Sequence, residues 1–467
     1  MWVTYTKIRL SLFFCYHILM PSVFNLFSTI KTQSTQSKGV KQSAISITGS
    51  LIASGFAAIS LMLLSRALQP TSFGQFSTAF ALTLILVRLN DLGLSVATSK
   101  LIPNATNESR SALSSYILRY RLALSGLILV LGIIISQFLP NFLLQDNSSL
   151  ILISFIVCFA TAFFEHFQFI LQADHRFKLA AVLNASQGLL KLLFSLPAVI
   201  LILQGTLSPA TLITPIFLIY MLSPVIPVIL LWLIKPGFLP VNLKLPTTLD
   251  KTQQKRLKQQ LFSLIKHAAL GIVAAGIIEN VDILFVQGFL DDYQAGLLGG
   301  VTRIALLFYI VGYSLGNVLN PRVAKYKQYS DLVTFWKKAW LILAGCVLGF
   351  VLLMFAVEPL IFFTIGQEYL QAANSLRVLL GAGFITIALM PFIAFFYSFE
   401  QSWYFSLSGV LQLLIVILGN IWLVPIMGIE GSAWVRLASR GVLLILTIFL
   451  VRHQLGKMKT AQREQII

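Results

Sequence analysis

The stretch LSRALQPTSFGQF, Leu64–Phe76, interrupts apolar sequence that runs from Ala44 to Leu63 and resumes from Phe76 to Ala97. Its centre is rich in Gln, Pro, Thr, Ser and Gly, several of which favour turns. Each flanking run is about as long as the roughly 20 residues that a helix needs to cross a bilayer. The stretch therefore predicts a short turn between two membrane-spanning helices.

The same alternation of apolar runs and polar turns continues along the 467 residues. Hydrophobic residues make up 57% of the chain and charged residues 11%, and the mean hydropathy is +0.86. A soluble protein carries about 25% charged residues, so this composition excludes a soluble fold. It predicts an all-α polytopic membrane protein with about twelve transmembrane helices. The expected spans are residues 44–66, 76–97, 118–138, 149–171, 179–203, 209–234, 261–287, 296–320, 336–357, 373–397, 403–425 and 429–451.

The net charge of +18 is distributed unevenly over these spans. Of the 34 lysines and arginines, 27 fall on one face of the predicted membrane protein, when that face is taken as both termini and the stretches 98–121, 172–178, 235–266, 321–338 and 398–402. None lies in the opposite loops, and the remaining seven lie deeper in the spans. This asymmetry follows the positive-inside rule and predicts that both termini are cytoplasmic. Basic stretches such as KTQQKRLKQQ (251–260) are then retention signals that contact anionic membrane lipid, so no nucleic-acid partner is expected.

A second polar turn, VQGFLDDYQAGLL (286–298), indicates an internal repeat. Aligning Gly74 with Gly296 places ALQPTSFGQF over FLDDYQAGLL, so the first two spans correspond to the seventh and eighth. Both halves then begin on the same side of the membrane, as in transporters with two parallel lobes around a central cavity. The expected parts are a cytoplasmic N-terminal segment (1–43), an N-terminal six-helix lobe (44–234), a basic cytoplasmic linker (235–260), a C-terminal six-helix lobe (261–451) and a cytoplasmic tail (452–467).

The N-terminal segment allows more than one interpretation. Residues 8–27 are apolar enough for a signal peptide or an extra span, although no small-residue cleavage site is evident. Alternatively, translation begins at Met20. The three cysteines, Cys15, Cys158 and Cys346, have no metal or redox spacing and are interpreted as small apolar residues.

Three stretches resemble a known family. LLSRALQPTSFGQFSTAFAL with LNDLGLSVATSKLIP is similar to the N-terminal signature of polysaccharide biosynthesis proteins, the Wzx-type oligosaccharide flippases. NVDILFVQGFLDDYQAGLLGGVTRIALL with NPRVAKY resembles the start of their C-terminal half, and MGIEGSAWVRLASRGV resembles their last helix. The resemblance covers about residues 43–452 and places the chain in the multidrug/oligosaccharidyl-lipid/polysaccharide exporter superfamily.

The resemblance implies a multi-pass protein of the bacterial inner membrane. It implies transport of undecaprenyl-diphosphate-linked oligosaccharide from the cytoplasmic to the periplasmic leaflet by alternating access, for O-antigen and lipopolysaccharide, capsule or exopolysaccharide. The expected partners are the lipid-linked oligosaccharide, membrane lipid, a polysaccharide polymerase and chain-length proteins.

Charged residues inside the spans are costly unless they pair or face water, so each is a functional candidate. Arg303 lies in the family-like pattern GGVTRIA, and a guanidinium suits a diphosphate because it can meet two oxygens at once. We expect substrate contact from it, with packing against an acid as the alternative. The other basic candidates are Arg66, Arg88, Lys191, Arg436 and Arg440. For Arg88 the alternative is an ion pair with Asp91, and for Arg66 extension to the membrane surface.

Three carboxylates are candidates for coupling transport to H⁺ or Na⁺, namely Asp282, Glu279 and Asp91. A carboxylate inside the membrane can exchange a proton or a cation as the conformation changes. The alternative for Asp282 and Glu279 is pairing with an arginine of a neighbouring helix. Glu165 is a weaker candidate. No catalytic residue, metal site or organic cofactor is expected.

Two other functions remain open on the sequence. A cation-coupled multidrug exporter of the same superfamily would share the fold but would favour an acidic lumen, whereas this chain has seven basic residues in its spans. A membrane polysaccharide polymerase or glycosyltransferase would need a large outer loop, and the longest expected here, 358–372, is short. We therefore expect no enzyme.

Overall fold

A computed structural model of the chain describes residues 38–135, 148–234, 250–323, 326, 329–399 and 403–464. The described residues are helical with no β-strand, which confirms the all-α fold class. The helices are α2 (Lys38–Asp91), α3 (Leu94–Leu101), α4 (Asn107–Ile135), α5 (Ser148–Ala173), α6 (Phe177–Leu203), α7 (Pro209–Leu222), α8 (Val225–Ile234), α9 (Lys251–Phe289), α10 (Asp292–Val323), α11 (Tyr329–Met354), α12 (Val357–Thr364), the 3₁₀ turn η2 (Gln367–Ala372), α13 (Ala373–Ser398) and α14 (Trp403–Glu464).

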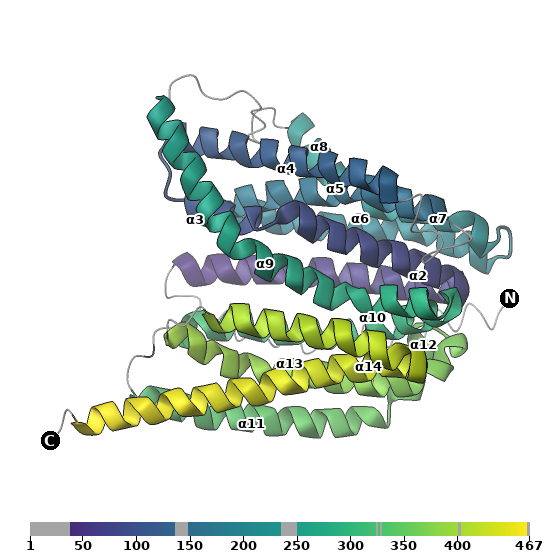
Figure 1. Ribbon diagram of the computed structural model, residues 1–467. Helices are drawn as coiled ribbons and strands as arrows, with labels where there is room; N and C mark the ends of the chain where they lie inside the picture. The colour runs from purple at the N-terminus through teal and green to yellow at the C-terminus, as the bar shows by residue number, and fades with distance from the viewer. Residues whose placement is uncertain are drawn as a thin grey trace.

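Two of these helices fold back on themselves. In α2 the chain reverses at Gln69, which has φ 60° and ψ 169° and is followed by Pro70. In α14 it reverses at Gly428, with φ 61° and ψ −142°. Figure 1 shows both reversals on the right of the bundle. The turn predicted between residues 64 and 76 is therefore present.

The number of spans agrees with the expectation of about twelve. Nine described helices are long and apolar enough to cross a membrane, and the pair α7 and α8, bent by 43° at Ser223 and Pro224, makes a tenth. The reversals at Gln69 and Gly428 each divide one long helix into two. Together these make twelve spans.

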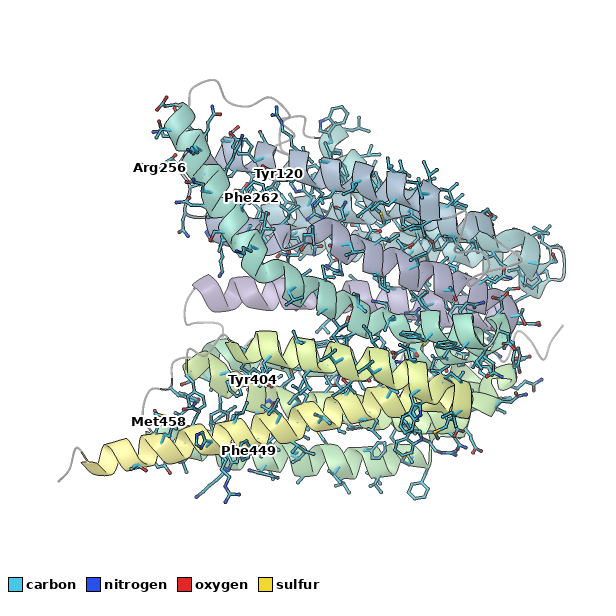
Figure 2. All side chains as sticks on the ribbon, viewed as in Figure 1. Tyr120, Arg256, Phe262, Tyr404, Phe449 and Met458 are labelled. Atoms are coloured by element: carbon cyan, nitrogen blue, oxygen red, sulfur yellow. The ribbon has the colours of Figure 1, made fainter. Side chains whose placement is uncertain are left out.

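The bundle has two distinct ends. The hairpin end, as we call it, carries the turns at Gln69 and Gly428. The opposite end, called the basic end, carries Arg256 and Met458, both labelled on the left of Figure 2. The long helices run roughly between these two ends, so residues from distant parts of the sequence meet at the same depth (Figure 1).

Apolar side chains are buried in two large clusters. One is formed mainly by α2, α5 and α7, and the other by α10, α13 and the segment from α12 to η2. Met62 and Ala81 of α2 belong to the second cluster, so α2 packs into both halves of the chain. In Figure 1 the helices α4 to α8 lie above and α11 to α14 below, with α2, α9 and α10 between them.

Helix α9 differs from the expected boundaries because it begins at Lys251, so residues 251–260 of the expected linker are helical. Its first part packs with α3 and α4, where Leu261 joins the cluster that contains Leu94 and Tyr116. The rings of Tyr120 and Phe262 meet there edge to face, with centroids 5.0 Å apart (Figure 2). Residues 1–37 and 235–249 lie outside the described residues.

Candidate functional site

The two halves make close backbone contact near the hairpin end. A Cβ atom placed on Gly74 of α2 would overlap the carbonyl oxygen of Asp292, and one placed on Gly296 of α10 would overlap the carbonyl oxygen of Pro70. One turn further along, a Cβ on Gly299 would lie 2.7 Å from the Ser77 hydroxyl. The absence of side chains on these glycines therefore allows α2 and α10 to cross in direct contact.

Polar side chains join the halves beside this crossing. The carboxylate of Asp292 accepts hydrogen bonds from the amide of Gln75 at 2.6 Å and from the amide of Gln287. Gln287 in turn accepts a hydrogen bond from Thr78 at 3.1 Å. The Tyr369 hydroxyl donates to the backbone carbonyl of Ser65 at 2.8 Å. These bonds close the hairpin end between the two halves.

Arg88 and Asp91 do not form the ion pair that was the alternative for them. Arg88 pairs with Glu165 of α5 at 2.8 Å, and Asp91 pairs with Arg121 of α4 at 2.7 Å. The second pair is almost fully buried, at 0% and 2% exposed. Asp91 also accepts hydrogen bonds from the Ser95 backbone and hydroxyl. The pairs differ from the expectation because Glu165 approaches Arg88, and Arg121 approaches Asp91, from other helices.

Asp282 is held by Arg436, as the pairing alternative predicted. The closest approach is 2.6 Å, and Asn420 donates a further hydrogen bond to Asp282 at 3.1 Å. Both members of the pair are buried. This carboxylate is therefore engaged between α9 and α14 in the conformation observed.

Arg440 and Glu279 are linked through a tyrosine. Arg440 donates hydrogen bonds to Gln412 at 2.9 Å and to the Tyr313 hydroxyl at 3.3 Å, and Tyr313 donates to Glu279 at 2.9 Å. Arg440 is buried, whereas Glu279 is exposed. The structure thus brings Glu279, Arg436 and Arg440 close together, because Arg436 also donates to the Glu279 carbonyl.

Arg303 and Lys191 have a different environment. The guanidinium of Arg303 lies 4.9 Å from the centroid of the Phe80 ring, and the ammonium of Lys191 lies 4.8 Å from that of Tyr220. The two rings meet edge to face at 5.9 Å, within a cluster that also contains Phe76. Among the described residues, neither cation has a carboxylate within salt-bridge distance. We call these two cations and two rings the cation–aromatic site.

Burial makes the cation–aromatic site unusual. Arg303 is only 6% exposed, and its Nε atom has no hydrogen-bond partner among the described residues. A ring face attracts a cation, but it offers no acceptor oxygen for the guanidinium donors. Buried charges are normally paired, so this arrangement leaves two positive charges available to an anion.

Arg66 lies apart from the other candidates. It is at the hairpin end, where its guanidinium donates to the Phe363 carbonyl at 3.3 Å. For metals, no group of three or more potential ligands is found within the described parts of the chain.

Two features escaped sequence reasoning. Arg121 was counted among the loop charges although it falls inside the expected span 118–138, and that position was the signal for its burial. The aromatic residues around Lys191 and Arg303 could not be distinguished from the many other aromatics, which make up 12% of the chain.

Comparison with protein families gives a match over residues 40–247, to the family described as polysaccharide biosynthesis protein. This match agrees with the family that the sequence resembles. The matched residues include the reversal at Gln69 and the cations Arg88 and Lys191. A comparison with curated proteins gives no match.

Solved structures show the same fold. An inward-facing multidrug resistance MATE family transporter of the MOP superfamily has a TM-score of 0.69 at 13% identity, over 90% of this chain and 99% of that one. Lipid II flippase MurJ in an inward closed conformation gives 0.67 at 15% identity, over 88% and 89% of the two chains. An outward-facing MATE family transporter gives 0.55 at 14% identity, over 91% and 100%. The chain therefore has the same fold as these transporters.

Proposed function

We propose that the chain is a flippase for undecaprenyl-diphosphate-linked oligosaccharide, acting from the cytoplasmic to the periplasmic leaflet of the bacterial inner membrane. The observation that carries this proposal is the cation–aromatic site, where Arg303 and Lys191 have no carboxylate partner among the described residues. The match to the polysaccharide biosynthesis family supports a substrate in that pathway, such as a precursor of O-antigen, capsule or exopolysaccharide.

The charge distribution favours an anionic cargo. Arg88, Arg121 and Arg436 are each offset by a carboxylate of the chain itself, so they stabilise the protein rather than offer charge. The two cations of the cation–aromatic site come from different halves, Lys191 from α6 and Arg303 from α10. A diphosphate bound between them would be neutralised by both halves at once, and the guanidinium could meet two of its oxygens.

The proposed transport cycle uses the contact between the halves. The units are the lobes 44–234 and 261–451, joined through 235–260, and the basic end faces the cytoplasm by the positive-inside rule. In the present conformation the Gly74–Gly296 crossing closes the hairpin end. Substrate then reaches the cation–aromatic site from the basic end while its lipid tail stays in the membrane. Rocking of the lobes would separate α2 from α10 and release the headgroup outward.

Coupling to H⁺ or Na⁺ is assigned to Glu279 in this scheme. Asp91 and Asp282 are occupied by buried arginines, which makes exchange of a proton or cation there costly. Glu279 is exposed and accepts a hydrogen bond from Tyr313, itself linked to Arg440. A change of charge at Glu279 would therefore alter its hydrogen bond to Tyr313 of α10 and, through Tyr313, the contact with Arg440 of α14.

The alternative is a cation-coupled multidrug exporter, which the similarity to MATE transporters keeps open. A cationic cargo would need an available carboxylate inside the membrane. Asp91, Glu165 and Asp282 each bind an arginine instead, and Glu279, the remaining candidate, is linked through Tyr313 to Arg440. This observation favours the flippase. A polymerase and chain-length proteins would be the partners that receive the flipped product.

The decisive experiment is the leaflet location of lipid-linked oligosaccharide in cells carrying Arg303→Ala with Lys191→Ala. We expect the complete repeat unit to accumulate on the cytoplasmic face while the protein level stays normal. Arg377→Ala is the matched control, because that arginine is partly exposed, at 29%, and pairs with Glu358. Normal transport in the double variant would exclude the cation–aromatic site as the anion site. Repeat units that cross but stay unpolymerised in cells depleted of the protein would indicate a polymerase.

A further inference from the structure

A polar pocket of about 530 Å³ lies at the hairpin end, away from the cation–aromatic site. Its wall is formed by the reversal in α2, the start of α7, the start of α10 and the turn η2. The side chains that matter for its chemistry are Gln69, Thr71, Ser72, Tyr293, Gln367 and Gln371. Of the described residues in the lining, Glu368 alone is charged.

This lining suits a neutral polyhydroxylated ligand. An amide group both donates and accepts hydrogen bonds, as a sugar hydroxyl does, and three glutamines converge on the pocket. Tyr293 adds an aromatic surface with a polar end. Among the described residues, no lysine or arginine lines the pocket, so its known lining offers no positive charge to neutralise a phosphate. We propose that this pocket is a carbohydrate-binding site for a neutral oligosaccharide on the outer face of the protein.

The backbone of Gln69 supports this assignment independently. Its φ of 60° with ψ 169° lies in a region that glycine adopts freely and that strains other residues. The reversal in α14 has nearly the same φ, 61°, and there the residue is Gly428. Strained positions of this kind concentrate where a side chain serves a ligand. Residue 69, in contrast to Gly428, is a glutamine, and it lines the pocket.

The pocket is also placed to sense the conformation. Gln69 and Ser72 belong to the N-terminal half, whereas Tyr293 and Gln371 belong to the C-terminal half. Pro70 lines the pocket too, and its carbonyl contacts Gly296 at the crossing. Separation of the halves would pull the walls apart, so an oligosaccharide bound here stabilises the conformation that is closed at the hairpin end. Such binding would regulate transport by glycan on the outer side. That regulatory role rests on the proposed flippase function, whereas the binding site itself does not.

The test uses the full-length protein in lipid nanodiscs and a defined probe. The probe is the oligosaccharide released by mild acid from the host cell's own lipid-linked intermediates, which lacks the lipid and the diphosphate. Saturation-transfer NMR should detect binding to the wild type. Tyr293→Ala and Gln371→Ala should each weaken it at least tenfold, whereas Gln204→Ala, an exposed glutamine of the same end outside the lining, should leave it unchanged.

A further variant separates binding from folding. Gln69→Gly removes the side chain and relieves the backbone, so the thermal unfolding temperature should not fall although binding weakens. No binding by the wild type up to millimolar probe would overturn the proposal. So would equal binding by the wild type, Tyr293→Ala and Gln371→Ala.

Arg303→Ala distinguishes the two proposals. It should keep the outer oligosaccharide site and lose flipping. Loss of binding in Arg303→Ala would assign the signal to the cation–aromatic site and overturn the outer site. Unchanged flipping by Arg303→Ala, with binding retained, would remove the proposed role of Arg303 in transport and leave the outer site standing.

Discussion

Gly74 and Gly296 lie against each other at equivalent positions of the two sequence repeats. A Cβ atom on Gly296 would overlap the carbonyl oxygen of Pro70, which lies four residues before Gly74. A Cβ atom on Gly74 would likewise overlap the carbonyl oxygen of Asp292, which lies four residues before Gly296. The contact is therefore reciprocal, as at an interface across a two-fold axis. The two halves of one chain meet at this end as two subunits of a symmetric dimer would.

This relationship predicts the effect of adding one methyl group. Gly74→Ala and Gly296→Ala should each disturb the crossing, at a cost of about 1–3 kcal/mol typical of overpacking. The protein should favour conformations open at the hairpin end, and flipping should fall. Spin-label distances across α2 and α10 would measure the opening. Gly126→Ala is the control, since nothing lies within 4 Å of a Cβ there. Unchanged distances and transport in both variants would contradict a role of the crossing in closure.

Arg303→Lys tests the shape of the anion site. Lysine keeps the positive charge, but it lacks the planar fork that meets two oxygens of a diphosphate. We expect flipping between that of the wild type and that of Arg303→Ala, measured as oligosaccharide exposed on the outer leaflet per unit of protein. Full activity in Arg303→Lys would indicate that only charge matters, and activity no better than in Arg303→Ala would indicate that geometry decides.

The pair of Asp91 and Arg121 should act on stability. Asp91→Asn leaves a buried, uncompensated guanidinium, and breaking such a pair costs about 3–5 kcal/mol. The unfolding temperature in detergent should drop, and the double variant Asp91→Asn with Arg121→Met should recover much of the loss. A single variant as stable as the wild type would show that water or another group reaches Arg121.

Glu279→Gln should uncouple transport from the ion gradient. The amide oxygen still accepts the Tyr313 hydrogen bond, but the side chain can no longer exchange a proton or a cation. Flipping in vesicles should persist without a gradient and should stop responding to an imposed H⁺ or Na⁺ gradient. Glu358→Gln is the control, since that carboxylate is 61% exposed and pairs with Arg377. A retained gradient response in Glu279→Gln would place coupling elsewhere.

The architecture was predictable because it depends on local patterns. Turn residues between long apolar runs located the reversal at Gln69, and the repeat alignment made Gly74 and Gly296 equivalent. The direct contact between these glycines was not predicted, because an alignment relates positions without bringing them together.

Partner choice inside the membrane could not be predicted. Membrane helices that are apolar around most of their circumference give little indication of which side faces a neighbour. For that reason Asp91 was considered with Arg88, one turn away, rather than with Arg121 in α4. The rotation of each helix about its own axis also decides that Lys191 lies over Tyr220 and Arg303 over Phe80. These contacts bring together residues far apart in the sequence.

Helix α9 is fastened to both halves. At the basic end the Tyr116 hydroxyl donates to Gln254 and the ammonium of Lys258 lies over the Tyr116 ring, whereas Ala274 and Ile278 pack against α14. If the halves rock apart as proposed, a continuous helix fixed to both of them has to bend between the two attachment points. Gly271 lies in that interval with open space around it. Elastic energy stored there on outward opening would favour return to the inward conformation, so that each cycle resets without a second substrate.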